Sequence, residues 1–428
     1  MPMLRIVIPN FKPVGCGSPT IRRTLSSALY ITGDKAKEQY APLVPYLDFQ
    51  TKLANLDRLE HNLRLRRYQL DFDALKRQWE LYRSIELRKR DIETRRVQLR
   101  DLIAKATSDD EVKQLKMQAV LAKEDLKSLK ESGYAVANAF VANKFLGIPN
   151  ELHERTPTEQ KVVLFRNSSN KPTRDNSIGK EWLEEHSSTS FYMTEDAALM
   201  DLFLPMTCSY VFQEAGFVLF SNPDFARSVL VEAARVDADS IYLINEEVDL
   251  EHTLNRLHLC GGGTMLSFLG YFTKLSVFPT ALPLRLVTVG NQYHREKTQT
   301  RAVQTMAVAT QETEAIRIFD DTLELYKRFY DRLGINYRLV LIPAPDLDPA
   351  EALRVDVEVY SPEIDDYIKV GDLCYYSNFI SKRIAFNYHE GKTQKFPYMV
   401  SGTVLGSVNL IKLLLQHGIH FKDLKVVE

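Results

Sequence analysis

Residues 56–132 contain neither glycine nor proline. These two residues interrupt helices most strongly, so a stretch of this length without them predicts long helices. In its second half, apolar residues recur at spacings of three and four, which is typical of a coiled-coil seam. They are Val112, Leu115, Ala119, Ala122, Leu126 and Leu129. The sequence KATSDDE marks a break, and two long helices joined by a short turn must run antiparallel.

We therefore expect helices over about 55–105 and 109–132, within an arm that spans residues 34–149. At 1.5 Å per residue the first helix would be roughly 75 Å long, which is too long to be buried in one compact domain. The arm should project into solvent or onto a partner. The net charge of the whole chain is only −1, so a surface for nucleic acid must be local.

The first helix of the arm carries an excess of positive charge. Between Arg58 and Lys105 there are 14 Lys or Arg residues against 8 Asp or Glu, whereas residues 109–131 have 5 against 6. Phosphate backbones bind such basic stripes. A solvated coiled-coil face with internal ion pairs would have the same composition. We expect eight cations to lie on or near one side of the helix, and we take them as candidate RNA-binding residues. They are Arg66, Arg67, Arg83, Arg88, Lys89, Arg90, Arg95 and Arg96.

The first 33 residues contain no Asp or Glu, four Lys or Arg, and several Ser and Thr. This composition is typical of a mitochondrial presequence and predicts import into the matrix; a disordered basic tail is the alternative. No apolar run reaches the length of a membrane span, so we expect no membrane partner.

Residues 150–428 alternate helical stretches with strand-like ones, and strands predominate from 280 to 390. The pattern predicts an α+β domain with a mostly antiparallel sheet flanked by helices. The Gly-rich CGGGT at 260–264 lacks the spacing of a phosphate-binding loop and indicates a turn. The four cysteines are far apart, and the nine histidines have no metal-binding spacing. We expect neither a metal nor a cofactor.

An arm of this kind followed by such a domain resembles the seryl-tRNA synthetases, which are class II aminoacyl-tRNA synthetases. The sequence EAGFVLFSNPDFAR (214–227) resembles motif 1, a dimer-interface element, and ALPLRLVTVGNQYHRE (281–296) resembles the start of motif 2. The sequence SGTVLG (401–406), leading into an apolar helix, resembles a degraded motif 3. Further likenesses are RVDVEVYSP (354–362), FISKRIAFNY (379–388) and NKFLGIPNELHERTP (143–157).

The resemblance fails where adenylate chemistry needs charge. The motif 2 arginine falls on His294, with Arg295 adjacent and Glu296 retained. The acid that helps hold ATP and magnesium falls on Lys369, and the motif 3 asparagine and arginine fall on Met399 and Ser407.

Other family positions are also changed. Glu314 matches the acid of the motif 2 return strand, whose other polar residues fall on apolar residues or threonine, at Met306, Val308 or Ala309, and Thr310. The Thr-x-Glu loop that binds serine reads Asn245, Glu246 and Glu247. The loss of one group that stabilises charge in the transition state lowers the reaction rate by a factor on the order of 10²–10³.

The resemblance thus implies a synthetase paralogue without catalytic residues, which binds tRNA, or another mitochondrial RNA, through its arm and needs no cofactor. It also implies a dimer, either of two copies or with a true mitochondrial synthetase. Two alternatives stay open: an active serine–tRNA ligase with a divergent pocket, and a structural or regulatory partner that binds no RNA.

Overall fold

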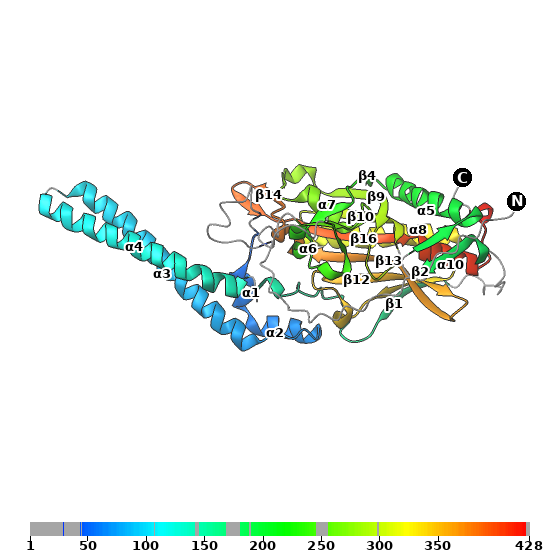
Figure 1. The fold of residues 1–428 in the computed structure, drawn as a ribbon, viewed down its shortest axis with the longest axis horizontal. Helices are drawn as coiled ribbons and strands as arrows, with labels where there is room; N and C mark the ends of the chain where they lie inside the picture. Colours follow the sequence, from blue (N-terminus) through cyan, green and yellow to red (C-terminus); the bar gives the residue numbers. More distant parts are fainter. Residues whose placement is uncertain are drawn as a thin grey trace, which may run out of the picture.

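A computed structural model describes Leu29, Leu43 and residues 45–106, 108–141, 145–167, 180–187, 190–244, 256–297 and 299–424. The large sheet and its helices confirm the predicted α+β class. Figure 1 shows a helical arm at one end of the molecule and the sheet domain at the other. The expected serine loop at 245–247 and all of segment 1–33 except Leu29 lie outside the described residues.

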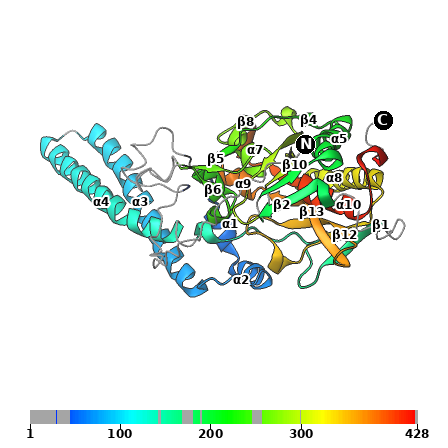
Figure 2. The same cartoon turned by 45° about the vertical axis from the view of Figure 1, so that its right-hand side comes forward.

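The arm consists mainly of α3 (Phe72–Lys105) and α4 (Asp109–Val141), which run antiparallel and pack side by side in both views (Figures 1 and 2). The second helix is longer than expected, because Gly133 does not end it. A Cβ atom at Gly133 would lie 3.3 Å from Cγ2 of Ile85 on α3. The absence of a side chain therefore allows close packing of the two helices at this point.

The expected single helix over 55–105 is wrong. It is divided into α2 (Leu56–Leu65) and α3, with α1 (Phe49–Ala54) before them. Arg67 adopts a positive φ of 50° and ends the first helical stretch. Asp71 then caps α3, since its carboxylate accepts a hydrogen bond from the amide of Ala74 at 2.9 Å. The 34 residues of α3 make a rod of about 50 Å instead of the expected length.

The bend between α2 and α3 is anchored to the sheet domain. Arg66 is only 7% exposed and donates hydrogen bonds to the carbonyl oxygens of Asp348 and Glu351. The hydroxyl of Tyr68 donates to the carbonyl oxygen of Gly147 at 2.7 Å. These tertiary contacts explain why local helix propensity does not continue through the bend.

An eight-stranded sheet forms the centre of the second domain, in the order β1-β11-β12-β13-β16-β10-β9-β4. Neighbouring strands are antiparallel except for β4 and β9, which are parallel. The strands are β1 (Val162–Asn167), β4 (Val218–Leu219), β9 (Leu284–Gln292), β10 (Thr300–Ala309), β11 (Tyr337–Leu341), β12 (Leu353–Ser361), β13 (Asp366–Ser377) and β16 (Tyr398–Gly406).

Two hydrophobic cores cover the two faces of this sheet. Three helices pack in the first core: α5 (Glu195–Glu214), α8 (Glu312–Leu333) and α10 (Ser407–Gln416). The second core contains α6 (Ser228–Ala233), α7 (Met265–Phe272), α9 (Phe379–Arg383) and the base of the arm. Along β10, Val303 and Ala307 enter the first core, and Met306 and Val308 the second, as the two-residue period of a strand requires.

Three small sheets surround the large one. Their strands are β5 (Phe225–Arg227), β7 (Leu257–Leu259) and β6 (Tyr242–Leu243); β15 (Thr393–Lys395), β14 (Asn387–Glu390) and β8 (Ser276–Val277); and β2 (Leu183–Ser187) and β3 (Ser190–Met193). Among the described residues, no helix is both long enough and apolar enough to span a membrane.

Leu29 lies within segment 1–33, which its composition predicts to be a presequence, and it packs in the fold. Its side chain is completely buried in the second core, and its amide donates to the carboxylate of Glu232 at 3.0 Å. At least this residue of the expected presequence therefore belongs to the folded body.

Candidate functional site

A cavity of about 1770 Å³ opens beside the large sheet. Its wall combines the β9–β10 hairpin, the middle of β13, the end of β16, helix α6, strand β7 and the segment 348–351. Three of the candidate site residues line it, namely His294, Glu296 and Lys369. Met399, Ser407 and Glu314 do not line it.

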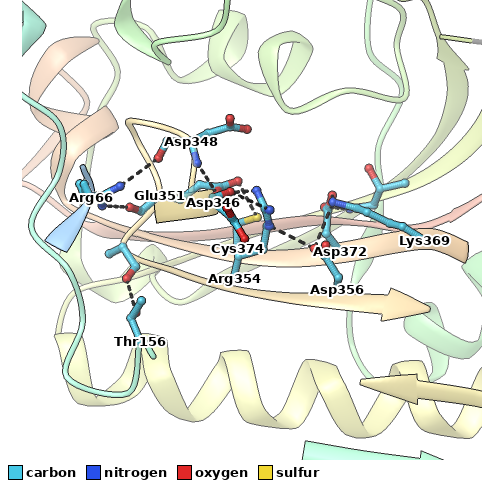
Figure 3. Close-up of polar contacts among 12 residues, drawn as sticks. Arg66, Thr156, Asp346, Asp348, Glu351, Arg354, Asp356, Lys369, Asp372 and Cys374 are labelled. Atoms are coloured by element: carbon cyan, nitrogen blue, oxygen red, sulfur yellow. Dashed lines mark hydrogen bonds and ion pairs between the residues drawn. The ribbon is translucent and has the colours of Figure 1, made fainter. Parts of the chain in front are cut away.

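Lys369 lies at one end of an ion-pair network in this wall, where it contacts two carboxylates (Figure 3). Its ammonium is 3.0 Å from a carboxylate oxygen of Asp356 and 2.9 Å from one of Asp372. Arg354 approaches the same oxygen of Asp356 from the other side, at 3.1 Å. Two carboxylates beside the cavity are thus neutralised by side chains of the protein itself.

These contacts change the acidity of each group. Burial raises the pKa of Asp356 above its ordinary value, despite the cations beside it. Burial also acts to raise the pKa of Asp372, but Lys369 outweighs it and leaves the pKa below its ordinary value. Burial lowers the pKa of Lys369, yet the two carboxylates outweigh it and raise the pKa above that of an ordinary lysine. Lys369 therefore carries a stable positive charge at neutral pH.

The network continues toward the arm through Glu351, which also lines the cavity. One oxygen of its carboxylate accepts from Arg354 at 2.9 Å, and the other accepts from the thiol of Cys374 at 3.2 Å. Burial raises the pKa of Glu351 to about 7. The backbone carbonyl of Glu351 is an acceptor for Arg66 (Figure 3). The guanidinium at the bend of the arm therefore supports the same segment that forms the cavity wall.

This placement corrects our expectation for Arg66. It is a buried structural residue rather than a member of an exposed RNA-binding row. The other seven candidates do not share one face either. Arg67 lies at the bend before α3, and the other six lie on α3. Residues seven apart lie on the same side of a helix, so three rows result. They are Arg83 with Arg90, Arg88 with Arg95, and Lys89 with Arg96. Lys89 lies toward the seam, half-buried and 3.5 Å from Glu86.

A second set of hydrogen bonds connects polar side chains in the cavity wall. The side-chain amide of Gln292 donates to the carbonyl oxygen of Gly263 at 2.7 Å and to the hydroxyl of Thr403 at 3.0 Å. The hydroxyl of Thr403 donates to Gln304 at 2.7 Å, and the amide of Thr403 donates to Asp372 at 3.2 Å. The two networks therefore meet at Asp372.

The Gly-rich segment CGGGT is a turn, as predicted, and it also borders the cavity, which we did not predict. Its glycines allow close contact with strand β9. A Cβ atom at Gly261 would lie 1.9 Å from the carbonyl oxygen of Asn291, and one at Gly263 would lie 2.5 Å from that of Gly290. The only signal available in the sequence was the unusual run of three glycines before an apolar helix.

Curated relatives identify the family of this fold. The chain is 34% identical over 423 residues to the serine–tRNA synthetase-like protein Slimp of Drosophila melanogaster, which covers 94% of this chain and 91% of the relative. The chain belongs to the seryl-tRNA synthetase family. The mitochondrial serine–tRNA ligase of Mus musculus is 22% identical, over 90% of this chain and 81% of its own length.

The fold comparison agrees with this assignment. The crystal structure of the seryl-tRNA synthetase of Pyrococcus horikoshii in complex with ATP superposes with a TM-score of 0.75 at 16% identity, over 87% of this chain and 94% of that one. At this identity the likeness shows the fold alone. No protein-family model matches the chain.

His294, which we expect at the motif 2 arginine position, does not supply the charge of an arginine. Burial, followed by the effect of Lys297, lowers the pKa of His294, so its imidazole is neutral at pH 7. Its Nδ1 atom accepts a hydrogen bond from the amide of Glu296 at 3.1 Å. The side chain of the adjacent Arg295 is exposed and does not line the cavity.

Ser407, at the position of the motif 3 arginine, is completely buried. Its hydroxyl donates to Asp201 on α5 at 2.6 Å, so the side chain is directed to the helix layer. Met399, at the asparagine position, is also completely buried, in the second core. Neither position presents a polar group to the cavity.

The expectation for Glu314 needs a correction. It is not on the return strand of motif 2, because β10 ends at Ala309. Glu314 lies in the first turn of α8, where a carboxylate interacts favourably with the positive end of the helix. The apolar Met306 and Val308 on β10 are completely buried.

The residues present do not fit ATP with magnesium, the group that this family uses. A cation needs free carboxylates, and Asp356 and Asp372 already bind the ammonium of Lys369. Transferring phosphoryl groups need fixed positive charge, and the neutral His294 and the buried Ser407 do not provide it at the two positions where the resemblance places arginines. Among the described residues, no three His, Cys, Asp or Glu side chains are grouped to hold a metal ion.

We predict that Ser407→Arg will not produce activity. The long side chain would enter a packed site facing Asp201, which should cost about 1–3 kcal/mol of stability through overpacking. Chemical denaturation followed by circular dichroism measures this cost, and serine-dependent ATP–pyrophosphate exchange measures activity.

The matched control is Asn409→Arg, because Asn409 is exposed and lines the cavity. This variant should keep the stability of the unmodified chain. Exchange activity in Ser407→Arg alone would show that the assignment of the motif 3 position is right and that the rest of the site is competent.

Proposed function

We propose that this chain is a synthetase paralogue without catalytic activity, which neither binds ATP nor activates serine. The observation that carries the proposal is the position of Lys369 between Asp356 and Asp372. Adenylate formation needs a metal cation and positively charged side chains around the phosphates. Here the carboxylates are already neutralised, and the cavity offers neither of the two phosphate arginines.

The arm is proposed to bind tRNA, and serine tRNA is the first one to test. Another mitochondrial RNA is the alternative. Support comes from the membership in a tRNA synthetase family and from the unpaired cations of α3. Within the described arm, Arg83, Arg88, Arg90 and Arg95 are exposed and form no ion pair. They are therefore available to phosphates from two sides of the helix.

A dimer is proposed through the outer face of α5 and β4. Strand β4 lies within the motif 1 stretch at 214–227, and α5 ends where that stretch begins. An apolar patch of this kind marks a protein interface more often than a free surface. Seven large apolar side chains on these two elements are exposed: Leu199, Leu202, Phe203, Met206, Tyr210, Val218 and Leu219. The patch fits either a second copy or the true mitochondrial seryl-tRNA synthetase. The second possibility also supports a regulatory role as a dimer partner.

A mitochondrial location is proposed from the acid-free segment 1–33 and from the mitochondrial relative of Mus musculus. Because Leu29 packs in the core, we place any cleavage of this segment before Leu29.

The first test is a pair of titrations on one purified sample, with ATP and with labelled tRNA. We expect RNA binding without ATP binding, and no serine-dependent ATP–pyrophosphate exchange above that of a boiled sample. The mitochondrial ligase of Mus musculus is the positive control for exchange. Exchange by this chain would favour the divergent active ligase instead.

A second prediction concerns the arm. Replacing Arg83, Arg88, Arg90 and Arg95 by Ala should weaken RNA binding and reduce the slope of log K against log salt, since each phosphate contact adds about 0.7–0.9 to that slope. Alanine is a good helix former, so the circular dichroism spectrum should stay nearly unchanged. Filter binding at several salt concentrations gives the slope.

The control removes four cations from α4, at Lys113, Lys116, Lys123 and Lys130, which are also exposed. Because α4 has a balanced charge, this variant should bind RNA more tightly than the α3 variant. If both variants bind RNA as tightly as the unmodified chain, a function as a structural partner becomes the favoured one.

A third prediction concerns import. Deleting residues 1–28 should leave the protein in the cytosol, because the basic acid-free segment is removed. Leu29 is retained, so the thermal unfolding midpoint should change little. Fractionation of cells that express the two forms measures the location. A truncated chain still found in the matrix would show that the targeting information lies elsewhere.

A further inference from the structure

Lys52 lies on the short helix α1, at the junction between the arm and the sheet domain. Its position is fixed on both sides. Phe49 on the same helix packs in an aromatic cluster with Trp79, Tyr82, Phe140 and Phe145. Just before the helix, the amide of Tyr46 donates to the carbonyl oxygen of Lys382 at 2.9 Å, which ties this segment to α9.

The charges around Lys52 are predominantly positive. Its ammonium lies 4.9 Å from the centre of the Phe379 ring, and the guanidinium of Arg383 lies 4.1 Å from the centre of the same ring. Lys382 is the neighbouring residue of α9. Arg383 is almost completely buried and donates only to the carbonyl oxygen of Leu146.

The two acids that face this group are already paired with other cations. Asp48 forms an ion pair with Lys382 at 3.6 Å, and its other oxygen caps α1 at the amide of Thr51. Glu151 forms an ion pair with Arg58 at 2.8 Å. Within the described part of the chain, no acceptor forms a hydrogen bond or ion pair with the ammonium of Lys52. The side chain as a whole is half-buried.

This environment destabilises the charged form of the amine. Burial is the main cause, followed by the repulsion of Arg383, and together they lower the pKa of Lys52 to about 7. A desolvated lysine beside another cation is the usual way in which proteins obtain a nucleophilic amine at neutral pH. The neutral amine has a free electron pair, whereas the ordinary lysine ammonium does not.

We propose that Lys52 is a site of covalent acylation, at which its amine takes the acyl group of a small activated donor such as an acyl thioester. The new bond joins Nζ to the carbonyl carbon, and the carbon–sulfur bond of the thioester breaks. The amine releases one proton, and the thiolate leaving group takes up one proton. No oxidant or reductant is needed. The product is a neutral amide, which removes one positive charge from beside Arg383 and Lys382.

The test uses acetyl-CoA with the folded full-length chain, followed by quantitative peptide mass spectrometry. At pH 7.5 we expect acetylation of Lys52 to be at least about tenfold faster than that of Lys123, because most of an ordinary lysine is protonated at this pH. Lys123 is an exposed lysine of α4. The rate at Lys52 should level off above pH 7 to 8, while the rate at Lys123 continues to rise. Equal rates at the two lysines would overturn the proposal.

A second variant tests the cause. In Lys382→Gln, Asp48 loses its partner and becomes available to Lys52, four residues further along the chain. The pKa of Lys52 should rise, and its acetylation at pH 7.5 should slow several-fold. The matched control is Lys395→Gln, which breaks the remote ion pair with Glu390 and should leave the rate unchanged. An unchanged rate in Lys382→Gln would refute the proposed role of the charge arrangement.

Discussion

The ion pairs of Lys369 with Asp356 and Asp372 determine what the cavity can do. Each carboxylate needs a cation, because a buried unpaired charge costs several kcal/mol. In a catalytic site of this kind the cation can arrive with the substrate. In this protein it is part of the chain, and it is present at all times. The wall is therefore electrostatically complete before any ligand enters. This arrangement explains how the carboxylates beside a large cavity are stabilised by the chain itself.

The same network joins the two parts of the molecule. Asp356 contacts Arg354, which contacts Glu351, whose backbone carbonyl is held by Arg66 at the bend of the arm. Every step is a hydrogen bond or ion pair between buried or half-buried groups, which are the kind that resist solvent competition. The direction of the arm is thus set by contacts with the cavity wall as well as by the turn at Arg67. A change in segment 348–351 would therefore alter the contacts of Arg66, at the bend before α3.

The two domains differ in how much the sequence reveals. The absence of glycine and proline predicts the arm, and the spacing of leucines predicts its seam, because helices depend on local pattern. The bend at residues 66–71 was not predicted, because it depends on contacts of Arg66 and Tyr68 with residues that are distant in the sequence. Composition alone also could not separate the buried Arg66 from the exposed Arg88. The motif positions of His294 and Lys369 were predicted to meet in one site, and both line the cavity. The exact direction of Ser407 and the helical position of Glu314 required the register of β10 and β16.

The residues at the expected motif 3 positions contribute to the packing of this fold. The apolar Met399 and the small Ser407 are completely buried, where an amide or a guanidinium would need partners. Met399 fills the second core opposite Val308, and Ser407 bonds to Asp201. Polar groups that serve a reaction are commonly destabilising, so packed residues at these positions favour stability. Lys369 stabilises the fold through charge rather than packing, because it neutralises two carboxylates that would otherwise repel each other. The charges in this wall are thus balanced within the fold itself, while apolar side chains on α5 and cations on the arm remain exposed.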